Sequence, residues 1–173
     1  RGDFAFAANG STGAVEASAE RASAGLRAGP VEIGVREASL GLRVNASGAK
    51  ALEATGTLAA DLPADLSLTA STVAVRLNET GNAHTGETVA IAGVSHTFAS
   101  LEASTTLREV VLGGVDLDLA GFLQVGGDFA VRAEEDTVTL SDGSSAEVEV
   151  LTLGASEATG FVGYHGGSSE ALG

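Results

Sequence analysis

The sequence contains no cysteine, no tryptophan and no methionine in 173 residues, and only two prolines. A chain without cysteine has no disulfide framework, no thiolate nucleophile and no zinc site of the cysteine type. Aromatic side chains are limited to one tyrosine and six phenylalanines. A hydrophobic core must therefore be thin and built from Val, Leu, Ile and Ala.

Positive charge is scarce as well. Nine Lys and Arg residues stand against 23 Asp and Glu residues, which gives a net charge of -14. Nucleic acid and anionic lipid both attract basic surfaces, so we expect neither as a partner. No apolar run approaches the roughly 18 residues that a membrane helix needs, and we expect no membrane insertion.

What the sequence has in quantity is alternation of apolar and polar residues, which indicates half-buried strands. Apolar residues occupy odd positions over 31–35 and even positions over 40–44. The parity switches again between 66–70 and 73–77, and each switch predicts a corner. Residues 14–29 are rich in helix-forming Ala, Glu and Arg, but they alternate in the same way. With 24 glycines and many turn-like stretches, the pattern predicts an all-β fold.

Two all-β architectures could bury these strands. An elongated parallel β-solenoid of short strands tolerates a thin aliphatic core with glycine at its corners. A β-sandwich is the alternative, although it usually places some aromatic side chains between its two sheets. The scarcity of aromatics and the parity switches favour the solenoid.

A short phrase near the start of the chain returns late in it. Gly2–Ala5 and Gly127–Ala130 both read Gly-Asp-Phe-Ala, 125 residues apart. After a shift of five residues, Glu37-Ala38 also matches Glu157-Ala158. This order of features indicates an internal repeat. The predicted domains are residues 1–125, one full repeat unit, and residues 126–173, the first part of a second, similar unit.

Several stretches resemble parts of a tandem-repeat unit found in very large secreted bacterial surface proteins of the adhesin type. They are GDFAF, VEIGVREASLGL, ALEATG, LPADLSLTASTVAVRLNETG and VDLDLAGFLQVGGDFAV. The resemblance covers nearly the whole chain. It implies an extracellular or cell-surface location, an elongated and repetitive architecture, and an adhesive or structural role. That family provides no catalytic residues to place on this chain.

From these observations we expect a structural repeat of an extracellular fibrous or adhesive surface protein, and not an enzyme. Stacked repeats have open sheet edges, and an open edge accepts another strand. Identical repeats or subunits are therefore the expected partners, assembled end to end into a filament. The strands that carry the repeated phrase are the expected assembly strands, with Gly2, Asp3, Phe4, Gly127, Asp128 and Phe129 as their residues.

Three of the four asparagines begin Asn-x-Ser/Thr sequons, namely Asn9, Asn45 and Asn78. The sequons predict glycosylation of a surface-exposed chain. The alternative is that these asparagines form turns, since an Asn side chain bonds readily to its own backbone.

Asp116 and Asp118 lie two residues apart in a predicted strand and therefore on one face. Their carboxylates would suit Ca²⁺; apart from this candidate calcium site, we expect no cofactor. The calcium-loop patterns are absent from the sequence, so a solvated strand face is the alternative interpretation.

Two rival functions remain open at this stage. A carbohydrate-binding or carbohydrate-active β-module would take a glycan ligand, and aromatic platforms for sugar rings would favour it. The second rival is a calcium-dependent adhesion domain. Three histidines, His84, His96 and His165, are isolated in the sequence and form no recognisable catalytic pattern.

Overall fold

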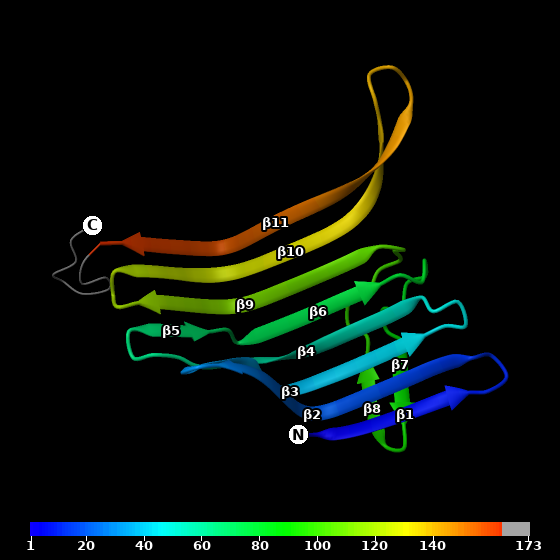
Figure 1. The fold of residues 1–173 in the computed structure, drawn as a ribbon, viewed down its shortest axis with the longest axis horizontal. Coiled ribbons are helices and arrows are strands. Elements are labelled where there is room, and N and C mark those ends of the chain that lie inside the picture. Colours follow the sequence, from blue (N-terminus) through cyan, green and yellow to red (C-terminus); the bar gives the residue numbers. More distant parts are fainter. Residues whose placement is uncertain (164–173) are drawn as a thin grey trace.

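The computed structural model describes residues 1–163, which form eleven β-strands and no helix (Figure 1). The predicted all-β class is confirmed. Residues 164–173, which include His165 and Tyr164, lie outside the described part of the chain. The strands are β1 (Asp3–Asn9), β2 (Ala14–Ala28), β3 (Val31–Val44), β4 (Lys50–Asp61), β5 (Leu66–Thr69), β6 (Thr72–Asn78), β7 (Thr88–Ile91), β8 (Val94–Thr97), β9 (Leu107–Leu119), β10 (Leu123–Thr139) and β11 (Ser145–Val162).

Nine strands form one open sheet in the order β1-β2-β3-β4-β6-β9-β10-β11, and β5 lies end to end with β6 along β9. Every pairing within residues 1–163 is antiparallel. The predicted parallel pairing of a solenoid is therefore wrong. Short turns such as residues 10–13 and 29–30 join neighbouring strands, and so short a connection can only reverse the chain. A parallel pairing needs a crossover of a dozen or more residues.

The first parity switch in the sequence is a β-bulge in β3. The register of β3 against β4 shifts between Arg36 and Ser39, and Glu37 between them has a φ of 50°. The extra residue of a bulge changes which positions face each side of the sheet. Val35 and Leu40, on either side of the bulge, pack against the same cluster of buried alanines. The predicted corner is thus a bulge that keeps the apolar side chains on one face.

Residues 79–106 leave the sheet after β6 and cover one of its faces. They contain the β7–β8 hairpin, which crosses β1, β2 and β3 at a steep angle (Figure 1). The approach is close, because a Cβ on Gly41 of β3 would lie 2.5 Å from a ring carbon of His96. The largest buried cluster lies between this cover and the sheet and consists of Ala51, Val89, Phe98, Leu101 and Leu107.

Candidate functional site

The two copies of the Gly-Asp-Phe phrase have the same local structure. Gly2 has a φ of 148° and Gly127 a φ of 131°, which are backbone conformations that favour glycine. A Cβ on Gly2 would lie 2.6 Å from the Cα of Ala22, and one on Gly127 would lie 2.8 Å from the Cα of Ala158. Both positions therefore exclude any side chain, because the neighbouring backbone occupies its space.

The strand that faces each copy also carries a matching bulge. Arg21 in β2 has a φ of 49° and Glu157 in β11 a φ of 52°, and each directly precedes the alanine that faces the glycine. Glu37 in β3, which the repeat in the sequence matches with Glu157, has the same conformation, with a φ of 50°, and it also precedes an alanine, Ala38, that faces a glycine, Gly56. The β10–β11 hairpin is longer than its counterpart, with strands of 17 and 18 residues against 7 and 15.

The two copies differ in what lies along their other edge. β10 is paired on both sides, with β11 and with β9, and Phe129 lies opposite Leu112 of β9. β1 is paired with β2 alone among the described strands. Figure 1 shows β1 and β11 at opposite ends of the sheet. Both stretches predicted as assembly strands are therefore β-strands, and β10 is already paired along both of its edges.

The aspartates of the two copies reflect this difference. Asp128 accepts a hydrogen bond from the N–H of Gly114 in β9, over 2.8 Å. Asp3 instead forms an exposed ion pair with Arg21, on its own hairpin partner. The Asp128 carboxylate thus binds the backbone of the strand at its second edge, where Asp3 has no described strand to bind.

Asp116 and Asp118 lie on one face of β9, as the sequence predicted. Both carboxylate oxygens of Asp118 are already engaged, one by the N–H of Gly121 over 2.7 Å and the other by the amide of Gln124 over 2.6 Å. These two hydrogen bonds, the backbone one first, lower the pKa of Asp118. No group of three or more His, Asp or Glu side chains that could hold a metal ion occurs within residues 1–163. The geometry of Asp118 is that of a turn cap.

The three sequon asparagines all serve in turns. Asn9 accepts hydrogen bonds from the N–H groups of Ser11 and Thr12, and Asn45 accepts one from the N–H of Ser47. Asn9 and Asn45 are exposed, so a glycan on either would meet solvent. Asn78 is fully buried, and its amide nitrogen donates to the carbonyls at positions 82 and 102. The folded chain leaves no room for a glycan there.

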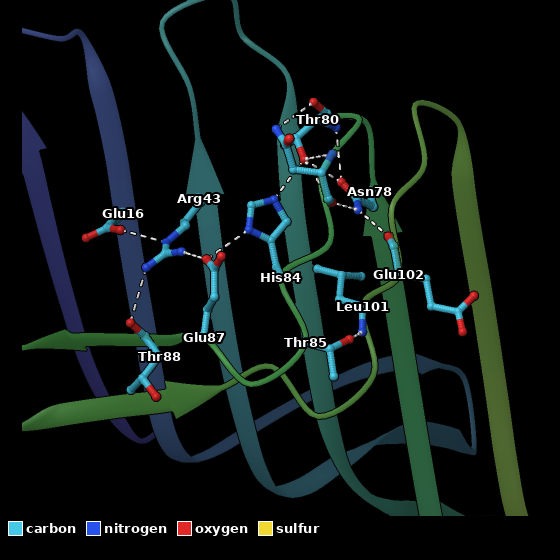
Figure 2. A network of polar contacts seen from close by, with 11 residues as sticks. Glu16, Arg43, Asn78, Thr80, His84, Thr85, Glu87, Thr88, Leu101 and Glu102 are labelled. Carbon is cyan, nitrogen blue, oxygen red and sulfur yellow. Dashed lines mark hydrogen bonds and ion pairs between the residues drawn. The ribbon is translucent and has the colours of Figure 1, made fainter.

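A polar network starts from Asn78 and ties the cover to the sheet (Figure 2). Thr80 donates to the Asn78 side chain over 2.8 Å, and its hydroxyl also lies 2.8 Å from Nε2 of His84. Nδ1 of His84 lies 3.1 Å from Glu87, which is ion-paired with Arg43 of β3. Hydrogen bonding by His84 and the charge of His84, followed by the charge of Arg43, lower the pKa of Glu87 against a smaller effect of burial. The network thus links the loop after β6 to the strands that it covers.

Thr80, His84 and Glu87 lie in the order of hydroxyl, imidazole and carboxylate that nucleophilic hydrolases use. A pocket of about 170 Å³ lies beside Thr80 and His84. A hydroxyl has one hydrogen, however, and Thr80 gives it either to Asn78 or to His84. With the hydrogen on Asn78, the Thr80 hydroxyl closes a turn and is not activated for attack. In either arrangement Thr80, His84 and Glu87 link the loop to the sheet, and we call these three residues the polar brace.

A second buried polar group lies where the cover meets the sheet. The Glu53 side chain is completely buried and accepts hydrogen bonds from the N–H groups of Ala99 and Ser100 and from Arg76. Burial is the largest influence on its pKa and would raise it, but these three donors together outweigh burial and lower the pKa. His96, 3.4 Å from Glu53, has a lowered pKa because burial disfavours its charged form.

Little in the sequence predicts this buried group. Glu53 lies within the ALEATG stretch, where it reads as the polar residue of an alternating strand. His84 and His96 looked isolated, yet both lie against Phe98, with ring centroids 6.0 and 5.4 Å from its own. The only available signal was the close spacing of polar residues and glycines in residues 79–106, a segment without regular alternation.

Comparisons with known proteins identify no relative. No family model matches the chain, and neither a curated protein nor a solved structure is similar to it. In the part of the chain that the structure describes, no helix could cross a membrane.

Proposed function

We propose that the chain is a structural repeat of an extracellular fibrous or adhesive surface protein, in which units join edge to edge into a filament. One observation carries the proposal: the second Gly-Asp-Phe strand, β10, continues the sheet directly from β9. If β10 is the first strand of a second unit, then the β9–β10 pair is the joint between two units.

The same strand pairing can be proposed for β1 and the last strand of a preceding unit. Phe129 and Val131 of β10 lie opposite Leu112 and Val110 of β9. A displacement of 125 residues carries this register to β1, so that Phe4 would face a residue equivalent to Leu112 of the preceding unit. Asp3 would then bind the backbone of that unit, as Asp128 binds Gly114.

Separate chains offer the same kind of contact through their outer edges. The outer edge of β1 on one chain would pair with the outer edge of β11 on another. Such a contact joins two different surfaces, and it therefore extends indefinitely unless the rotation closes a ring. The charge of -14 keeps neighbouring filaments apart in solution, which fits an extracellular polymer.

The edge of β1 is the place to test this proposal. Successive backbone N–H groups of a strand point to opposite edges. Of the two variants Ala7→Pro and Ala8→Pro, one therefore removes an N–H that points away from β2, and we call it the outward variant. The other removes an N–H that is bonded to β2, and we call it the inward variant. The outward variant should unfold at the wild-type temperature yet form no filaments by electron microscopy and sedimentation. The inward variant is the matched control, since it should lose stability.

Two results would contradict the proposal. The first requires two measurements together: the wild-type chain remains a monomer of 17.0 kDa in solution at every concentration, and the polypeptide isolated from its native source has the same mass. The other is filament formation that neither proline affects. A native mass many times larger would mean that the units are joined covalently, with the same sheet joint between them.

A further inference from the structure

One face of the sheet is apolar over its whole width and is not covered by any described residue. The strand registers place directly opposed residues on the same face, and a line of them crosses the sheet from β1 to β11. Alanines fill the β2 and β4 positions of this line. Its larger members are Phe4, Leu40, Val75, Val110, Val131 and Leu153.

These side chains are far more exposed than core residues. The exposed fraction is 57% for Phe4, 39% for Val75, 41% for Val110 and 72% for Leu153. A second line, two positions further along each strand, contains Phe6, Leu42, Leu52, Leu77 and Leu151. We call the face of the sheet on which these two lines lie the apolar face.

The charged side chains of the same strands lie mostly on the other face. Arg43, Glu53 and Arg76 all contact the cover or one another there, and Glu16 and Glu109 join them through ion pairs. Arg108 is the charged residue within the two apolar lines. The sheet thus separates charge from apolar surface, and the chain has placed its own second layer on the charged side.

The size of the apolar face sets the kind of partner that it needs. Eight strand positions at about 4.8 Å spacing, with strands of about twelve residues, present roughly 1,300 Å² on one side. Each partner in a stable protein interface contributes about 800 Å². Soluble monomers rarely expose a contiguous apolar patch of more than a few hundred Å².

We propose that the apolar face packs against the same face of a second copy of this chain, so that two sheets form a β-sandwich. Sheets pack about 10 Å apart through side chains of this aliphatic kind. Two copies that meet in this way bring together the face with the fewest charged side chains, and the ion pairs of each sheet remain on the outer sides of the sandwich. The contact does not depend on the edges β1 and β11.

The absence of cysteine makes a single introduced thiol a clean probe. Val75 of β6 lies in the middle of the sheet order, so Val75→Cys should be cross-linked to a dimer by a short thiol-specific reagent. Ala90→Cys is the matched control, because Ala90 is an exposed residue of β7, in the cover on the opposite face of the sheet. The proline variant that blocks the outer edge of β1 is the background for both, so that filaments do not contribute.

Sedimentation equilibrium should give twice the mass of 17.0 kDa for this background. The dimer should be lost in the double variant Val75→Asp, Val110→Asp, with unchanged far-ultraviolet circular dichroism. Val75→Thr with Val110→Thr keeps the branched shape of both side chains and guards against misfolding; it should weaken the dimer without unfolding the chain.

Three results would overturn the proposal. The first is a monomer at all concentrations, and the second is a dimer that survives both double variants. The third is binding of the wild-type chain to phosphatidylcholine vesicles that the same variants abolish, which would assign the apolar face to lipid. A wild-type chain that forms the dimer but no filaments would contradict edge joining alone.

Discussion

The backbone of Ala158 lies so close to Gly127 that a Cβ on the glycine would be 2.8 Å from the Ala158 Cα. The same relationship holds between Gly2 and Ala22, at the opposite end of the sheet. Bulges on the facing strands, at Arg21 and Glu157, accompany both contacts. The repeated Gly-Asp-Phe sequence therefore allows two strands to approach closely at a bulge.

Replacing Gly127 by alanine should destabilise the fold. The new Cβ meets backbone atoms that cannot turn away, and the φ of 131° is costly for a residue with a side chain, so we expect a loss of about 1–3 kcal/mol. Gly10→Ala is the control, because nothing lies within 4 Å of a Cβ there. Urea denaturation measures both. Equal stability of Gly127→Ala and the wild type would show that the bulge has no fixed geometry.

Glu53→Gln should be among the most destabilising single changes in the chain. The neutral amide turns an N–H₂ group toward donors and leaves Arg76 with one carboxylate partner, which we expect to cost about 2–4 kcal/mol. Glu109→Gln is the matched control, because Glu109 contacts the same arginine from a less buried position. Chemical denaturation of both variants compares the two losses, and a larger loss in the control would contradict the central role of Glu53.

The same carboxylate should make stability depend on pH. Because the folded chain lowers the pKa of Glu53, its contribution is fully present above the unfolded value of about 4.5 and is lost as the pH falls through the lower folded value. Unfolding free energies measured between pH 6 and pH 3 should therefore fall more steeply for the wild type than for Glu53→Gln. Parallel curves would mean that other carboxylates dominate acid unfolding.

Calcium offers a separate test of Asp118. Since its carboxylate caps the turn at Gly121, Asp118→Asn should lower stability by about 1 kcal/mol whether or not calcium is present. Thermal unfolding in calcium and in a chelator should give the same midpoint for the wild type. A midpoint that rises with calcium, and no longer rises in Asp116→Asn, would restore the calcium site that the sequence suggested.

Alternation predicted most of the sheet strands because those strands have one apolar face. It also located an irregularity between residues 35 and 40, although the predicted corner is a β-bulge at Glu37. Strand direction was predicted wrongly, because alternation is the same in parallel and antiparallel strands. The turn lengths carried that information: connections such as residues 29–30 are too short for a parallel return.

The polar brace could not be predicted in the same way. Thr80 and Glu87 come together with Arg43 only because residues 79–106 fold back across the sheet, and no local pattern specifies that path. Asn78 shows the difficulty clearly. Its sequon and its turn-forming character are both visible in the sequence, but its complete burial follows from the cover above it.

Strands that are neighbours in the sheet are, with few exceptions, also neighbours in the sequence. The main interruption lies between β6 and β9, where the cover intervenes. Each new strand therefore finds its partner already formed behind it, and the loop that must close is short, which favours rapid folding. A chain with this topology can fold progressively, strand after strand, in the order of its sequence. If units are joined as proposed, another unit would lengthen the sheet, and every earlier strand would still pair with a strand close to it in the sequence.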